Sequence, residues 1–519
     1  MEKVEMGKIE MQKEKKNFFG KFLSAIEKAG NKLPDPVVLF MILGGIVIVL
    51  SAIISSTGVS VVHPSTQETI TVVNLMSKEG FRKILSEVVR NFQGFPALGL
   101  VLVVMFGAGV AEKSGLMEMA MRNSVAKVPS KLVTAVILLA GILANAAGDA
   151  GNIVLPPLAA VIFLAVGRHP LAGIFAAYAG VTGGFAANFM INMSDIIAAS
   201  FTIPAAQVIN PIYNNTPAMN YYFIIASTLL ILAAGVFVTE KIVEPRLGKY
   251  EGEHQETAST TLSDVQKKGL KLAGISALVL IAIVLGLSLG NDPFMADAES
   301  GSVLAFKSPL MQGIVPLITL LFFVPGVVYG KVTGVIKNHR DVVSMMSKSV
   351  GEMGGYILLA FMASQFLAFF NWSNMGILTS VKGAEFLRNA GITGGGLIIG
   401  FILITCLLNL LIGSASAKWA IMAPIFIPMF MLLGYDPALT QMAFRIGDSI
   451  TNTITPLSPY FPIVIAFAKK YDKDAGMGTI MANMTPYTIV FGIVWTILLL
   501  VFMFLNLPLG PGGGIFYIQ

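Results

Sequence analysis

The sequence predicts an all-α protein that crosses a membrane many times, with about nine transmembrane helices and two re-entrant helical hairpins. Three observations predict this fold class. Of the 519 residues, 55% are hydrophobic and only 12% are charged, and the mean hydropathy of +0.77 exceeds what a soluble core can use. Many apolar runs approach the roughly 20 residues that cross a bilayer as a helix. Their weak strand-like alternation favours helices over a membrane β-barrel.

Residues 1–35 precede the first apolar run and are expected to form a cytoplasmic amphipathic helix. Eight lysines lie within the first 32 residues, interleaved with glutamates, and positive charge marks the cytoplasmic side of a membrane protein. No cleavable signal peptide is expected, because the apolar sequence begins only near Pro36. The net charge of +6 is therefore assigned to membrane topology, and no nucleic-acid partner is expected.

Residues 36–93 are expected to form the first span and an outer loop. The span occupies about 36–56. The loop that follows contains a predicted short strand at Thr69–Val73 and a predicted amphipathic surface helix at Lys78–Phe92.

Residues 94–243 are expected to form a first repeat with a re-entrant hairpin at about 132–166. A span beginning at Phe95 precedes this hairpin, and an interrupted span at Leu171–Met190, an outer loop and a span at Tyr221–Val238 follow it. Each apolar arm of the hairpin is too short to cross a bilayer comfortably. Basic residues flank both ends of the pair, so both ends are placed on the cytoplasmic side.

Residues 244–355 are expected to supply a cytoplasmic loop and two linking spans, and residues 356–519 a second, inverted repeat. The expected spans lie at about 270–289, 311–330, 356–370, 443–467 and 484–506, with a second hairpin at about 396–433. A shared spacing supports the duplication: Gly183 and Asn188 in the first half match Gly447 and Asn452, 264 positions later. An inverted repeat of broken segments is typical of the binding region of a secondary transporter.

The tips of the two hairpins carry polar residues among small ones, within Asn145–Pro157 and Gly413–Pro424. Helix breaks inside a membrane leave backbone groups that lipid cannot satisfy, so they persist where they line a wet cavity or bind a ligand. The alternative is close helix packing through small residues. Packing alone does not require the polar side chains found at these tips, which are those of Asn145, Asp149, Asn152, Ser414, Ser416 and Lys418.

Charged residues within the expected spans point to the same region. Arg445 and Asp448 are three residues apart on one helix face, and each is costly at membrane depth without a partner. They are interpreted either as a mutually neutralising pair or as functional groups. In the functional interpretation Arg445 binds a substrate carboxylate, and Asp448, with Asp195 in the first half, couples transport to Na⁺ or H⁺.

Amide oxygens could complete a cation site. Asn409 and Asn452 are candidates to hold Na⁺ together with Asp448, and Ser414 is a candidate for the same coupling role. Asn188 is a candidate for the substrate side, although an asparagine in a membrane helix is often a link between helices. Trp419 offers a flat apolar face to an aromatic substrate; the alternative is an anchor at the membrane interface.

Other classes of function are less well supported. The sequence lacks the His-Glu-x-x-His, Gly-x-Ser-x-Gly and Gly-x4-Gly-Lys-Ser/Thr motifs, so neither hydrolysis nor ATP-driven pumping has a site, and no enzyme is expected. The single cysteine, Cys406, excludes a disulfide framework. A channel is a further alternative. No cofactor is expected apart from Na⁺ or H⁺ as coupling ion.

The same residues carry a family resemblance. Asn409–Pro428, Arg445–Asp448 and Asn452–Pro456 resemble the p-aminobenzoyl-glutamate transporter (AbgT) family, with support from Gly107–Gly115 and Val238–Pro245. The resemblance implies a homodimer in a bacterial inner membrane, with a fold similar to that of dicarboxylate/Na⁺ symporters. The family's functional positions correspond to Asp195, Ser416, Trp419, Pro437, Arg445, Asp448 and Pro456.

The resemblance also implies a cation-coupled secondary transporter of p-aminobenzoyl-glutamate or p-aminobenzoate, in a family that includes sulfonamide exporters. A Na⁺-coupled importer of another dicarboxylate is the alternative. The tip of the first hairpin, Ala144–Ala147, has fewer hydroxyl groups than the family pattern. Neither the direction of transport nor the choice between Na⁺ and H⁺ follows from the sequence.

Overall fold

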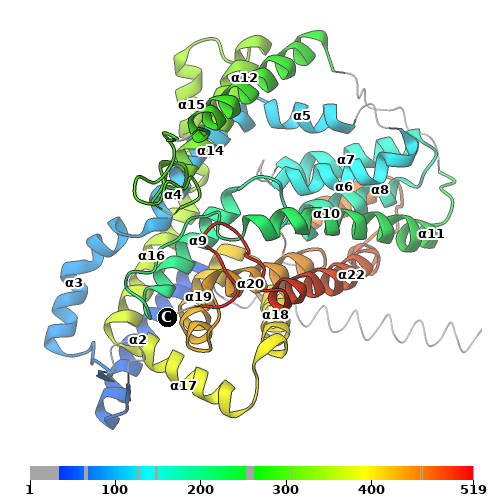
Figure 1. Cartoon of the computed structure of the whole chain (residues 1–519). Helices are drawn as coiled ribbons and strands as arrows, with labels where there is room; N and C mark the ends of the chain where they lie inside the picture. The colour runs from blue at the N-terminus through cyan, green and yellow to red at the C-terminus, as the bar shows by residue number, and fades with distance from the viewer. Residues whose placement is uncertain are drawn as a thin grey trace, which may run out of the picture.

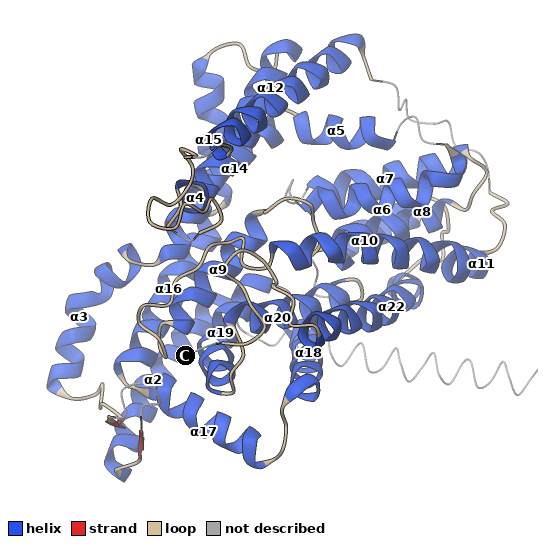
Figure 2. Cartoon of the chain, viewed as in Figure 1, coloured by secondary structure: helices blue, strands red, loops and turns tan. Residues whose placement is uncertain are grey.

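The computed structural model is almost entirely helical, with two short strands (Figure 2). It describes residues 34, 36–62, 68–125, 129–145, 150–252, 262–290, 292–305, 307–455, 458 and 460–517. The amphipathic helix expected within 1–35 falls almost wholly outside these ranges. Nine helices of the described chain are long and apolar enough to cross a membrane. Seven of these helices are continuous spans, and the other two are the arms of the second hairpin. The seven continuous spans, together with two broken spans, make the nine crossings that were expected.

The N-terminal elements agree with the sequence prediction. Helix α2 (Pro36–Thr57) leads to strands β1 (Ser60–Val62) and β2 (Thr69–Thr71), which pair in antiparallel register. Helix α3 (Lys78–Gln93) is amphipathic and begins where the Ser77 hydroxyl accepts a hydrogen bond from a backbone N–H of the first turn.

A group of helices of different lengths forms the upper part of the molecule in Figure 1. Helix α4 packs closely against α14 because each helix has a glycine where the two meet. A Cβ at Gly107 would lie 2.1 Å from the carbonyl oxygen of Thr319, so a larger residue would force the helices apart. Helix α12 exposes most of its apolar surface, as a helix that faces lipid does. The helices of this group are α4 (Pro96–Lys113), α5 (Leu116–Val125), α12 (Asp264–Ser288), α13 (Pro309–Gln312), α14 (Ile314–Thr333) and α15 (His339–Glu352).

The first repeat contains a hairpin, a broken span and a continuous span. Its elements are α6 (Val133–Ala144), α7 (Ala150–Ala165), α8 (Pro170–Tyr178), a π-helical turn (Ala179–Gly183), α9 (Met193–Ala206), α10 (Tyr221–Val238), a second π turn (Thr239–Val243) and α11 (Glu244–Leu247). The expectation of an outer loop directly after Met190 is wrong. The chain re-enters a helix at Met193, where Asn192 and Asp195 form a reciprocal capping box.

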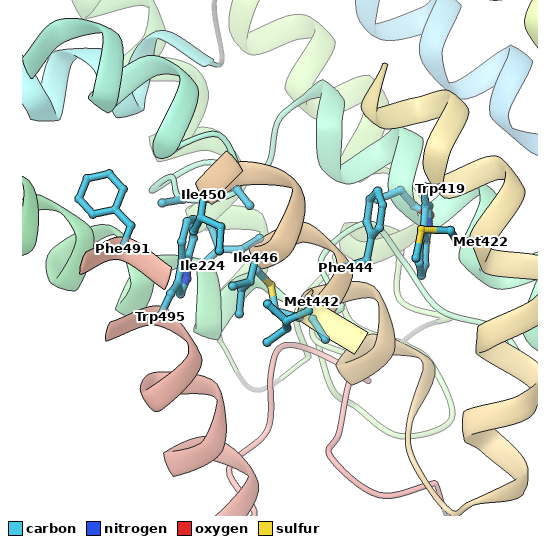
Figure 3. Packing of buried hydrophobic residues seen from close by; sticks show 14 of the residues in the cluster. Ile224, Trp419, Met422, Met442, Phe444, Ile446, Ile450, Phe491 and Trp495 are labelled. Atoms are coloured by element: carbon cyan, nitrogen blue, oxygen red, sulfur yellow. The ribbon is translucent and has the colours of Figure 1, made fainter. Parts of the chain in front are cut away.

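The second repeat follows the same order. Its elements are α16 (Gly354–Trp372), α17 (Met375–Asn389), the hairpin arms α18 (Gly394–Leu411) and α19 (Ala415–Leu432), the broken span α20 (Pro437–Asn452) and α21 (Phe461–Ala468), and α22 (Met477–Phe504). Helix α20 lies at the centre of the molecule (Figure 1) and is buried almost throughout. Figure 3 shows Met442, Ile446 and Ile450 facing Trp495 of α22.

The two broken spans run in opposite directions. His169, at the start of α8, has its ring 5.4 Å from that of Tyr250, which in turn lies 6.3 Å from the ring of Tyr471, just after α21. The start of the first broken span and the end of the second are thus on one side. Away from that side, Thr202 near the end of α9 accepts a hydrogen bond from Gln441 near the start of α20, at 2.8 Å. This arrangement is the inversion that the sequence predicted.

Candidate functional site

The tips of both hairpins and the breaks of both broken spans surround one cavity of about 430 Å³. Asn145 and Asn152 border it from the first hairpin, and Gly413–Ser416 border it from the second. Arg445 and Asp448 reach it from α20. The segments that the sequence singled out as interrupted are therefore brought together, although they lie more than two hundred residues apart in the chain.

Arg445 is paired with Asp195 rather than with Asp448. Its Nη1 lies 2.5 Å from Asp195 Oδ1, and its Nη2 donates to the Ser194 hydroxyl at 3.2 Å. Both charged side chains are nearly inaccessible to solvent. Asp195 Oδ2 also accepts the backbone N–H of Asn192, at 2.7 Å, so the carboxylate caps α9 and binds the guanidinium at once.

Asp448 is paired with Lys418, from the second hairpin. The Lys418 Nζ lies 2.6 Å from Asp448 Oδ1, and the two side chains are buried. The ammonium also donates to Asn409 Oδ1. The expected alternative of a mutually neutralising Arg445–Asp448 pair is therefore wrong, because each residue has its partner on another segment.

An aromatic wall lines the same cavity as Arg445 and Asp448. The rings of Trp419 and Phe444 are stacked, with centroids 4.5 Å apart and an angle of 28° between the planes, and Figure 3 shows them side by side. The indole N–H donates to the Ala198 carbonyl at 3.1 Å and to the Thr202 hydroxyl at 3.0 Å. Trp419 is buried inside the protein rather than anchored at a membrane surface. Both rings, with Phe185, line the cavity.

The hydroxyl groups of the second hairpin tip lie at the start of α19. Ser414 accepts the Ala417 N–H at 3.3 Å, and its hydroxyl lies 3.1 Å from that of Ser416. Both serines line the cavity. The start of α19 and two hydroxyls thus border the same space as Arg445, and this combination favours an anion.

The remaining predicted residues lie in different places. Asn145 lines the cavity and donates to the Ile142 carbonyl at 3.2 Å. Asn188 is buried and donates to the same carbonyl at 3.3 Å, so it links the broken span to the first hairpin. Pro437 occupies the first turn of α20, two turns before Arg445. Pro456 and Asp149 lie outside the described residues.

Several residues of the site were not expected. Lys418 was expected at the hairpin tip without a partner, and neither Ser194 nor Phe444 was among the predicted site residues. A local signal existed for Ser194, because Asn192 and Asp195 have the spacing of a capping box that starts a helix. Phe444 and the Lys418 pairing depend on contacts between distant segments, for which the sequence offers no local signal.

Comparisons with known proteins agree with this architecture. A family model described as "AbgT putative transporter family" matches residues 21–517. The chain is 38% identical to the p-aminobenzoyl-glutamate transport protein of Escherichia coli (strain K12) over 493 residues, which are 95% of this chain and 96% of that protein.

Two solved structures have the same fold. The YdaH transporter of Alcanivorax borkumensis, described as having an unusual topology, is 39% identical with a TM-score of 0.88 and covers 92% of this chain and 100% of its own. MtrF of Neisseria gonorrhoeae is 45% identical with a TM-score of 0.89, over 95% of this chain and 100% of its own. Its structure is said to illuminate a class of antimetabolite efflux pumps.

Proposed function

Because the chain belongs to the AbgT transporter family, we propose that it carries p-aminobenzoyl-glutamate and p-aminobenzoate-like aromatic carboxylates across the membrane, driven by a cation gradient. The chain is a multi-pass membrane transporter and not an enzyme. The observation that carries the substrate proposal is the composition of the cavity. One guanidinium and one helix start face a pair of stacked aromatic rings across about 430 Å³.

Each part of an aromatic carboxylate has a counterpart in this cavity. The guanidinium of Arg445 can bind a carboxylate through two parallel hydrogen bonds. The start of α19, with Ser414 and Ser416, offers a second place for negative charge, which suits the glutamate portion of p-aminobenzoyl-glutamate. The rings of Trp419 and Phe444 provide an aromatic surface for the aminobenzoyl ring.

Substrate binding at Arg445 requires an exchange of partners. The Asp195 carboxylate now holds Nη1 of Arg445 at 2.5 Å, so an incoming carboxylate competes with it for the same guanidinium. Asp195 also holds the start of α9. Releasing Asp195 therefore changes how the first broken span is held next to the second, and this links substrate binding to a movement of the repeats.

Sulfonamides fit the same proposal. They share with p-aminobenzoate an aminobenzene ring that carries an acidic group opposite the amine. A cavity that recognises the ring and the anion accepts both, so export of sulfonamides is part of the proposal. The aromatic wall favours such substrates over an aliphatic dicarboxylate, which was the alternative from the sequence. The homodimer and the inner-membrane location implied by the resemblance stay predictions.

Flux of radiolabelled p-aminobenzoyl-glutamate and p-aminobenzoate into proteoliposomes tests the proposal, with Na⁺ and pH gradients imposed separately. We expect saturable flux of the aromatic substrates that collapses when the driving gradient is removed. An aliphatic dicarboxylate such as succinate should compete weakly. Flux that prefers succinate would contradict the aromatic assignment, and flux that never saturates would indicate a channel.

A further inference from the structure

The oxygen atoms that were expected to hold Na⁺ are already engaged within the protein. Asn409 Oδ1 and Asp448 Oδ1 both contact the Nζ of Lys418. The third oxygen, Asn452 Oδ1, accepts a hydrogen bond from Asn409 Nδ2 at 2.9 Å. The Ser414 hydroxyl is bonded to Ala417 N–H and faces the Ser416 hydroxyl. The donor set that suits a sodium ion is therefore satisfied without one.

The position of the Lys418 nitrogen excludes an ion from the same place. The Nζ–Oδ1 distance to Asp448 is 2.6 Å, which leaves no space for a cation between the two atoms. Both side chains are buried, with 0% of Lys418 and 2% of Asp448 accessible. Asp448 Oδ1 has no hydrogen bond from the other described residues, so the ammonium is the group that balances this buried carboxylate.

Among the described residues, Lys418 is the cation paired with Asp448. Arg445, which lines the cavity, is instead engaged by Asp195 and Ser194 on the opposite broken span. The Asn409 amide nitrogen fixes the rest of the group, donating to the Asp448 carbonyl at 2.7 Å and to the Thr451 hydroxyl at 2.8 Å. The second hairpin and α20 thus meet around an ammonium, as two segments meet around a bound metal ion.

We propose that Lys418 is a tethered cation that takes the place of Na⁺ between the second hairpin and α20, so that this chain neither binds nor requires sodium. A free ion enters and leaves with each transport cycle, and its gradient can drive transport. An ammonium attached to the chain cannot leave. A sodium gradient therefore supplies no driving force through this site, and removal of the ammonium should create a sodium site from the oxygens that it now occupies.

Thermal unfolding of the purified full-length protein tests the occupancy without any substrate. Wild type, Lys418→Ala and Lys418→Ala/Asp448→Asn are compared in NaCl and in choline chloride at equal ionic strength. We expect wild type to melt at the same temperature in both salts. Lys418→Ala should melt several degrees higher in NaCl, because an ion that binds only the folded state stabilises it. The double variant lacks the carboxylate and should lose this difference.

A matched control isolates the site from the general loss of a lysine. Lys382 forms an exposed ion pair with Glu385 at 3.1 Å on α17, and Lys382→Ala should show no sodium effect. Recovery of folded Lys418→Ala only when Na⁺ is present also supports the proposal. If Lys418→Ala folds in neither salt, the melting temperature of the wild type tests the proposal. A value that stays unchanged up to saturating NaCl supports the tethered cation, and a sodium-specific rise overturns it.

A folded Lys418→Ala that melts identically in both salts would also overturn the proposal. In the flux assay, wild-type transport should be equal with and without a sodium gradient, and this part rests on the proposed function. If no aromatic carboxylate is transported, the proposed function fails while the melting comparison still stands. The two failures are therefore distinguishable.

Discussion

Asp195→Asn is expected to tighten the binding of an aromatic carboxylate while it slows transport. In the wild type, Asp195 holds Arg445 Nη1 at 2.5 Å and competes with the substrate carboxylate. A hydrogen bond to a charged group contributes about 1.5–3 kcal/mol, and about 1.4 kcal/mol corresponds to tenfold in affinity. Removing the competitor's charge should therefore lower the Kd for p-aminobenzoate by about 10- to 100-fold.

The same substitution is expected to reduce the stability of the substrate-free protein. Breaking a buried ion pair costs about 3–5 kcal/mol when the remaining charge stays buried. Asparagine keeps an oxygen that can accept the Asn192 N–H, now bonded to Asp195 at 2.7 Å, so the loss should lie near the lower end. Kd is measured by equilibrium binding in detergent, stability by thermal unfolding, and turnover by proteoliposome flux.

A capping box elsewhere in the chain provides the matched control. On α15, Asp341 accepts the backbone N–H groups of Asn338 and Lys337 at 3.0 and 2.7 Å, but it is only half-buried and pairs with no arginine of the described chain. Asp341→Asn should leave both Kd and flux unchanged. The competition argument is refuted if folded Asp195→Asn binds p-aminobenzoate with unchanged or weaker affinity.

Three further predictions concern the wall, the second ion pair and a loop carboxyl. Trp419→Leu should weaken p-aminobenzoate binding by up to about tenfold through loss of an aromatic pair, whereas Trp495→Leu, which removes a buried indole bonded to Ser227, should change only the melting temperature. Asp448→Asn should lower the melting temperature in thermal unfolding, because the buried Lys418 ammonium loses its counter-charge. Burial raises the pKa of Asp436 to about 7 from 3.8. Between these two values the folded state holds a proton that the unfolded state has lost, so the stability of the wild type should fall as the pH rises from about 4 to 7, by at most about 4 kcal/mol. Asp436→Asn should remove this fall, measured by thermal unfolding across the same pH range.

The sequence predicted the continuous spans and both hairpins because their signals are local. Runs such as those of α2 and α22 are long and uniformly apolar, and the hairpin arms end at clusters of small and polar residues. Helix α9 was missed because Met193–Ala206, although apolar, is too short to cross a bilayer and contains Pro204. Its local signal is the capping box at its start.

The pairing of the charges could not be predicted. Arg445 and Asp448 share a helix face by spacing, which favours a local pair. In the structure, Arg445 contacts a residue 250 positions earlier, and Asp448 contacts the lysine of the second hairpin tip. These partners are set by how the repeats pack around the cavity, and a helical periodicity contains no information about that packing.

The charges of the two ion pairs limit how a substrate carboxylate can enter the site. Lys418, Asp448, Arg445 and Asp195 carry two positive and two negative charges, so these four described side chains balance one another. A carboxylate that displaces Asp195 from Arg445 leaves two anions beside one guanidinium, which is costly in a buried site. Lys418 cannot supply that missing positive charge, because it is held by Asp448 and Asn409. The exchange at Arg445 is therefore least costly when Asp195 moves out of the buried site as the substrate carboxylate enters, and that movement shifts the start of α9, which Asp195 caps.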